Sequence, residues 1–181
     1  MSRKNRVWYP GAVYHIMCRG NHRHEIYRDD EDRQVYLTKL QETMEYFPYL
    51  LHGYCLMTNH VHLQLETIDI NISEIMKKIN MLYVLYFNKK YSFVGHLFQG
   101  RYRSEIIEED PQFLSTSRYI HMNPVMANMV ETPIEYPWSS YKVYLSESDC
   151  AISKKIVTTQ KVLGYFRGHS RKNYQKYVER I

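Results

Sequence analysis

The chain has 181 residues, a formal net charge of +5 at pH 7 and three cysteines. This length is typical of one domain with at most a small appendage, and it suffices for a core without disulfide or metal support. The odd, widely spaced cysteines exclude a disulfide framework and a CxxC zinc motif, so we expect a reducing, cytoplasmic environment. No apolar run approaches the ~18 residues of a membrane helix, and we expect no membrane partner.

The basic excess and the tyrosine content are both compatible with a nucleic-acid partner. Lys and Arg number 24 against 19 Asp and Glu, and 18 residues are tyrosine. Basic surfaces attract polyanions, and aromatic faces stack on unpaired bases. Neither feature is specific, because many basic proteins bind nothing anionic and most tyrosines are expected simply to fill half-buried positions.

The first two thirds of the chain alternate between strand and helix patterns. The predicted elements are a strand over 12–19, a helix over 29–47, strands over 49–57 and 60–66, a helix over 71–90, and a strand over 103–109. Acidic residues mark the start of the first helix, and Asn71 with Glu74 suggests a capping box at the second. This βαββαβ order is typical of the ferredoxin-like and RRM-like α+β folds.

The segment "MTNHVHLQLE" (57–66) places two histidines on one face of a strand. His60 and His62 point the same way because side chains alternate along a strand, while Val61 and Leu63 point to the opposite face. We expect both predicted helices to cover the Val61 face. The histidines then look out over an open sheet face, where RRM domains bind nucleic acid.

A further helix is predicted after the fourth strand, with Asp110 as its cap, Pro111 as its first residue and Pro124 at its end. Tyr119 falls on the polar side of this helix, and Asn123 lies one turn further on. His121 points about 200° away from Tyr119 at 100° per residue, so we expect a structural role for it. We divide the chain into a domain over 1–148 and a basic extension over 149–181, predicted as two short helices.

Two histidines on one strand can bind a single metal ion, although an exposed amphipathic strand explains the same pattern. A catalytic ion needs a further protein ligand, which Asn123 or Gln64 could supply. A hard divalent ion beside a tyrosine suggests phosphoryl transfer, with Tyr119 attacking phosphorus in line. The covalent phosphotyrosine would conserve the phosphodiester energy, so strand joining would need no ATP.

These residues resemble those of a known family. "NHVHL" is similar to the metal-binding motif of HUH endonucleases, and "SRYIHMNPVMANMVETPIEYPWSSY" resembles the nucleophile segment of single-tyrosine transposases. "YHIMCRGNHR" and "HLFQGRYRS" resemble further blocks of the REP-associated tyrosine transposase branch. The four blocks run in family order from residue 13 to residue 141.

The resemblance implies a set of residue roles. His60 and His62 match the metal ligands, Tyr119 matches the nucleophile, and Asn123 falls where relatives carry the third ligand. The implied ion is Mg²⁺ or Mn²⁺. The implied substrate is single-stranded DNA near a hairpin, cleaved to a 5′-phosphotyrosine and a free 3′-OH. The acting form is implied to be a monomer or a homodimer, since relatives of both kinds exist.

Two groups of residues are candidates for DNA contacts. One follows the first strand and the other precedes the fourth. The six candidates are Arg19, Asn21, Arg23, Arg101, Tyr102 and Arg103. Arginines suit phosphate contacts and a tyrosine suits stacking, but a solvated charged loop has the same composition.

Two other functions fit the same residues. The first is a non-catalytic, RRM-like module that holds single-stranded nucleic acid without cutting it. The second is a metal-dependent nuclease that uses water and forms no covalent intermediate. A tyrosine-linked DNA adduct distinguishes the transposase-like hypothesis from both.

Overall fold

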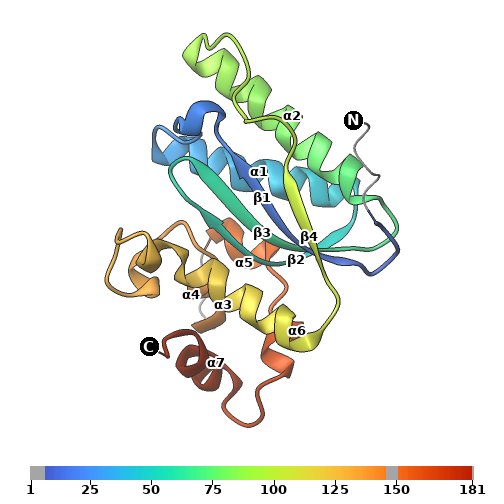
Figure 1. Cartoon of the computed structure of the whole chain (residues 1–181), viewed down its shortest axis with the longest axis vertical. Helices are drawn as coiled ribbons and strands as arrows, with labels where there is room; N and C mark the ends of the chain where they lie inside the picture. Colours follow the sequence, from blue (N-terminus) through green and yellow to red (C-terminus); the bar gives the residue numbers. More distant parts are fainter. Residues whose placement is uncertain (1–6, 146–150, 181) are drawn as a thin grey trace.

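The computed structural model describes residues 7–145 and 151–180 (Figure 1). Its centre is a four-stranded antiparallel sheet in the order β2-β3-β1-β4. The strands are β1 (Val13–Arg19), β2 (Tyr49–Leu56), β3 (His60–Thr67) and β4 (Arg103–Ile107). The α+β class and the order of strands and helices expected from the sequence are therefore confirmed. The predicted strand bounds are correct to within about two residues.

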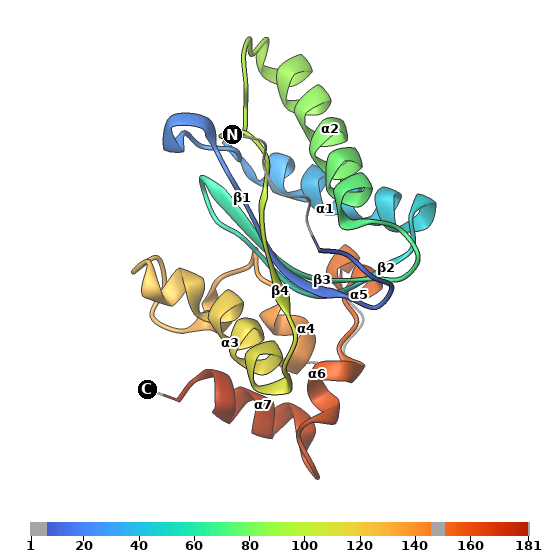
Figure 2. The same ribbon diagram turned by 45° about the vertical axis from the view of Figure 1, so that its right-hand side comes forward.

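Helices α1 (Asp30–Tyr46) and α2 (Ile72–Tyr91) pack together on one face of the sheet (Figures 1 and 2). The first helix begins with a capping box between Asp29 and Asp32. Asn71 caps α2 by accepting a hydrogen bond from the Ser73 amide, without the reciprocal Glu74 contact that we predicted. Both helices therefore start where the sequence indicates.

The opposite face of the sheet is not open, and that expectation was wrong. Helix α3 (Asp110–Met126) packs across β2 and β3. Figure 2 shows α4 and α7 on the same side of the sheet as α3. Phe113, Ser117 and Ile120 of α3 are buried there. The candidate site lies on this face, in a cavity lined by residues of β1, β3, β4 and α3.

Helix α3 differs from its prediction at both ends. Glu109 occupies the N-cap position and Asp110 is already the first helical residue. Pro124 lies inside the helix, which continues to Met126. A proline removes one backbone donor, but a helix can pass through it near its last turn, where few hydrogen bonds depend on that position. Asn123 therefore keeps helical geometry and stays aligned with Tyr119.

The C-terminal part forms more helices than predicted. After α3 come a short 3₁₀ helix, η2 (Pro133–Glu135), and the helix α4 (Tyr141–Leu145). A second 3₁₀ helix, η1 (Asn21–Arg23), lies between β1 and α1. Within its described residues the tail contains α5 (Ala151–Ile156), α6 (Gln160–Gly164) and α7 (Ser170–Val178), so there are three helices instead of two. Val157 pairs with Leu51 and covers the β2 edge. The division at residue 148 stays a prediction.

Most tyrosines belong to the core rather than to a stacking surface. Tyr83 and Phe87, for example, belong to the buried face of α2. The buried hydroxyls are often bonded to the backbone, as Tyr83 is to the Ile26 carbonyl. In the described part of the chain, no helix is both long and apolar enough to cross a membrane.

Candidate active site

Strand β3 places His60 and His62 on the sheet face that α3 partly covers. His60 lies opposite Arg19 of β1 in the antiparallel register, and His62 lies opposite Met17. His62 is only 2% exposed, whereas His60 is half-buried. The strand parity predicted from the sequence is confirmed, but the pair lies in a recess rather than on an open surface.

Both histidines make a hydrogen bond through the Nδ1 atom. His60 Nδ1 lies 2.7 Å from Asn59 Oδ1. His62 Nδ1 lies 2.9 Å from His15 Nε2, and the two rings stack with centroids 5.1 Å apart. These two hydrogen bonds use the Nδ1 atoms and not the Nε2 atoms of the two rings.

The environment keeps both imidazoles neutral near pH 7. Burial lowers the pKa of His60, and a hydrogen bond with Asn123 partly opposes this effect. Burial also lowers the pKa of His62 to about 3, and the neighbouring His60, His15 and Arg19 lower it further. Neutral imidazole is the form that ligates metals.

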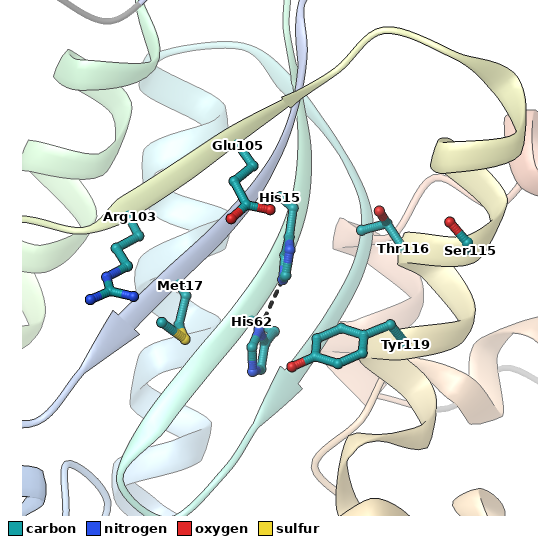
Figure 3. A pocket seen from close by; sticks show the side chains of 8 residues that line it. All are labelled: His15, Met17, His62, Arg103, Glu105, Ser115, Thr116 and Tyr119. Atoms are coloured by element: carbon teal, nitrogen blue, oxygen red, sulfur yellow. Dashed lines mark hydrogen bonds between the residues drawn. The ribbon is translucent and has the colours of Figure 1, made fainter. Parts of the chain in front are cut away.

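Tyr119 projects from α3 toward the two histidines. Tyr119 is 43% exposed, and its ring approaches those of His62 and His15 edge-on, with centroids 5.4 Å and 5.6 Å away. Figure 3 shows the Tyr119 hydroxyl pointing toward the His62 ring. Among the described residues this hydroxyl has no hydrogen-bond partner, so it is available to a ligand.

These side chains line a cavity of about 480 Å³ between the sheet and α3. Its walls come from β1, β3, β4 and α3 (Figure 3). The lining residues are His15, Met17, His62, Arg103, Glu105, Ser115, Thr116 and Tyr119. The cavity is large enough for a nucleotide and brings the predicted nucleophile and a predicted metal ligand into one space.

His60, His62 and Asn123 offer two imidazole nitrogens and an amide oxygen, which are donor types that divalent ions accept. Asn123 is 8% exposed and hydrogen-bonds His60, so its amide lies beside the first histidine. Gln64, the other candidate third ligand, is fully buried and donates to the Phe113 carbonyl at 2.9 Å. The described residues contain no group of three His, Cys, Asp or Glu side chains placed to hold a metal ion.

The residues predicted after the first strand fall into two places. Arg19 lies near both histidines and contributes to lowering the pKa of each. Asn21 and Arg23 line a second cavity of about 380 Å³, together with aromatic residues such as Phe87 and Phe93. Asn59 connects the two places, since its side chain also donates to the Arg23 carbonyl.

The residues before the fourth strand separate in the structure. Arg101 and Arg103 are exposed, and Arg103 reaches the first cavity. Tyr102 points to the opposite side, is 8% exposed and donates to Ser73 Oγ at 3.4 Å. Its predicted stacking on DNA was wrong, because alternation along an extended segment turns it into the core when its neighbours face out.

Three residues of this region are not among those predicted above for the site. They are His15, Asn59 and Glu105. Glu105 lies opposite His15 in the β1–β4 register. The strand parity of 12–19 could have identified His15, but contacts across strands require the register, which the sequence alone does not give.

Comparison with known proteins identifies the family. The family described as "Transposase IS200 like" matches residues 9–123, which contain both histidines, Tyr119 and Asn123. The chain belongs to the IS200-like transposase family. His121, which lies inside this family segment, is buried and bonded to Ser140 Oγ and Tyr174, so its predicted structural role is confirmed.

Two relatives extend the family match beyond this segment. The chain is 27% identical over 156 residues to a Haemophilus influenzae protein named as a REP-associated tyrosine transposase; the alignment covers 78% of this chain and 86% of the relative. It also has the fold of a REP-associated tyrosine transposase solved bound to a REP hairpin. That similarity has a TM-score of 0.72 at 16% identity, covering 84% of this chain and 90% of the other.

Proposed function

We propose that this member of the family is a metal-dependent endonuclease and strand transferase that acts on single-stranded DNA beside a hairpin. The observation that supports this most strongly is the position of Tyr119, whose free hydroxyl points at His62 inside a nucleotide-sized cavity. The related structure that shares this fold is described as bound to a REP hairpin, and we infer the same class of DNA for this chain.

His60, His62 and Asn123 would hold a Mg²⁺ or Mn²⁺ ion. The ion would polarise the phosphate and neutralise charge that develops on it. Two neutral imidazoles and an amide oxygen form a mixed donor set that several divalent metals accept. The burial of His62 keeps its nitrogen unprotonated near neutral pH, which favours ligation without a proton to displace.

Tyr119 would act as the nucleophile. In the cleavage step, its phenol loses a proton and the oxygen forms a bond to phosphorus. The bond between phosphorus and the 3′ oxygen breaks, and that oxygen takes up a proton to give a free 3′-OH. The 3′-OH of a second strand then attacks the 5′-phosphotyrosine, which restores Tyr119 and joins the strands.

Four arginines and an asparagine would hold the DNA backbone around this cavity. Arg19 and Arg103 flank the histidines, and Asn21 with Arg23 lines the second cavity beside them. Arg101 would add a further positive charge next to Arg103. Cationic contacts of this kind position the strand and make binding depend on salt.

The geometry supports catalysis by a single chain. Tyr119 lies beside His62 of its own sheet, so no second copy is needed to bring the nucleophile to the metal ligands. We therefore infer that the protein acts in cis, whether it is a monomer or a homodimer.

A covalent-capture assay tests this function. Labelled single-stranded hairpins from repeats near the gene are incubated with protein and Mn²⁺ or with EDTA, and the products are separated on a denaturing gel. We expect a metal-dependent protein–DNA band that Tyr119→Phe and His60→Ala abolish and that the exposed-site control Tyr46→Phe keeps. Cleavage without that band would support attack by water, and binding without cleavage would support a non-catalytic module.

A further inference from the structure

The two histidines of β3 must each present a bare nitrogen if they are to bind the same ion. A neutral imidazole has one N–H and one lone pair, and only the nitrogen with the lone pair can ligate a metal. His60 and His62 each use Nδ1 in a hydrogen bond within the protein. Which nitrogen carries the proton therefore depends on the partners of Nδ1.

Around His60, a chain of two hydrogen bonds fixes the proton. The backbone carbonyl of Arg23 can only accept, so the Asn59 atom 3.1 Å from it must be the NH₂ group. The Asn59 atom that faces His60 at 2.7 Å is then the carbonyl oxygen, which also can only accept. His60 must donate from Nδ1, so its lone pair lies on Nε2. Asn123 is the other side chain hydrogen-bonded to His60, and its amide NH₂ group can donate to that lone pair.

Around His62, the corresponding partner is His15, backed by a carboxylate. His62 Nδ1 and His15 Nε2 are 2.9 Å apart, so one donates and the other accepts. Glu105 faces His15 across the β1–β4 pair, and Figure 3 shows its carboxylate beside that ring. The carboxylate favours an N–H on His15 Nδ1, which leaves His15 Nε2 as the acceptor and His62 Nδ1 as the donor.

We propose that Asn59 and the His15–Glu105 pair are positioning residues that lock His60 and His62 in the Nδ1–H form, with both Nε2 lone pairs available to one divalent ion. The identity of that ion rests on the proposed function, but the proton positions are a property of the chain itself. Partners of this kind orient metal ligands and typically change metal affinity by about 10- to 100-fold.

The first test measures proton positions directly in the metal-free protein. The imidazole nitrogens are labelled with ¹⁵N, and two-bond correlation spectra at neutral pH distinguish protonated from bare nitrogens. We expect His60 and His62 both to show a protonated Nδ1 and a bare Nε2. Exposed His169 serves as an internal reference for an unconstrained ring. A protonated Nε2 on either β3 histidine would overturn the proposal.

The second test measures Mn²⁺ affinity by calorimetry with single variants. His15→Ala and Asn59→Ala should each weaken binding at least about tenfold, whereas His15→Gln, which keeps an acceptor for His62, should restore most of it. His169→Ala should leave the affinity unchanged. Affinities within about twofold of the parent for both alanine variants would contradict the proposal.

The two tests separate this proposal from the proposed function. If the parent protein binds no Mn²⁺ but shows both Nδ1–H forms, the positioning proposal stands and the metal-dependent activity fails. If the parent binds Mn²⁺ through His60 but the ¹⁵N spectra show the other proton position, the activity stands and the positioning proposal fails. Spectra of folded His15→Ala would also show His62 losing its fixed Nδ1–H state.

Discussion

Asn123 provides a specific case of how one side chain connects α3 to the candidate metal centre. It is nearly buried, lies one turn after Tyr119 and hydrogen-bonds His60. We predict that Asn123→Ala weakens Mn²⁺ binding at least about tenfold, while Asn123→Asp keeps an oxygen ligand and binds at least as tightly. Calorimetry measures both, with Gln41→Ala as an exposed-amide control. Equal affinities for the parent and Asn123→Ala would remove Asn123 from the ligand set.

Arg19 is predicted to contribute charge to DNA binding rather than to the chemistry. It lies opposite His60 across the β1–β3 pair, close enough to influence both histidines. Arg19→Ala should weaken binding to hairpin-flanked DNA and reduce the slope of log affinity against log salt by about one. Arg19→Lys should retain most of the slope, and Lys77→Ala on α2 should not change it. An unchanged slope in Arg19→Ala would exclude a phosphate contact.

For individual residues, the sequence predicts which side chains share a face when that depends only on their spacing. His60 and His62 share a face because strands alternate, and Tyr119 and Asn123 align because helices repeat every 3.6 residues. Asn59 and Glu105 were not predictable, because their roles depend on contacts across strands. Tyr102 was misassigned because composition says nothing of which way a loop residue turns.

Helix α7 stabilises the element that carries Tyr119. Tyr174 of α7 is fully buried and lies within hydrogen-bond distance of Ser117 Oγ at 2.7 Å and His121 Nδ1 at 2.6 Å, both in α3. Tyr174→Phe leaves these two groups without a partner, so we predict a loss of about 1–3 kcal/mol in the free energy of unfolding. Urea denaturation measures this loss.

A matched control uses an exposed tyrosine. Tyr46→Phe removes a hydroxyl that is not buried, and it should change the free energy of unfolding by less than about 0.5 kcal/mol. An equally small change in Tyr174→Phe would mean that α7 does not anchor α3 through these hydrogen bonds.

The elements themselves were predictable because their local signals agree. Alternation, acidic N-termini and apolar stripes indicate β1 to β4 and both early helices, and the structure confirms their order. The packing of α3 across β2 and β3 was not predictable. It depends on how Phe113 and Ile120 fit against the sheet, which is a tertiary property without a local pattern.

Across the whole molecule, an ion-pair cluster links the sheet to the C-terminal part. Glu66 of β3 contacts His52 Nε2 at 2.8 Å and Lys161 Nζ at 2.6 Å. The hydrogen bond from His52, followed by that from Lys161, lowers the pKa of Glu66 to about 2. In the unfolded chain the pKa of this carboxyl is about 4.3.

This difference predicts how stability depends on pH. The folded state binds fewer protons than the unfolded state between about pH 4.3 and 2, so the contribution of Glu66 is complete above this window and is lost as the pH falls through it. Glu66→Gln should lower stability at pH 7 and flatten the acid dependence in that window. Thermal unfolding from pH 7 to pH 2 tests this, with exposed Glu108→Gln as control. Parallel curves for the parent and Glu66→Gln would contradict it.

At the scale of the whole molecule, the tyrosine content reflects core packing. We expected most tyrosines to fill half-buried positions, and most of the large, fully buried side chains of the core are tyrosines. The open sheet face expected from the βαββαβ order is covered by later helices, and this covering turns a flat surface into the recess that holds His62 and Tyr119. Packing between distant segments therefore shapes the cavity, and it leaves no periodic pattern in the sequence from which it could be predicted.

The central claim is that Tyr119 forms a covalent bond to DNA, and peptide mass spectrometry tests it most directly. The protein is incubated with Mn²⁺ and a cleavable hairpin-flanked strand, denatured, treated with nuclease and protease, and searched for nucleotide-modified peptides. The account predicts one modified peptide, with a 5′-phosphonucleotide on Tyr119. A modification on another residue, or complete cleavage with no modified peptide, would contradict it.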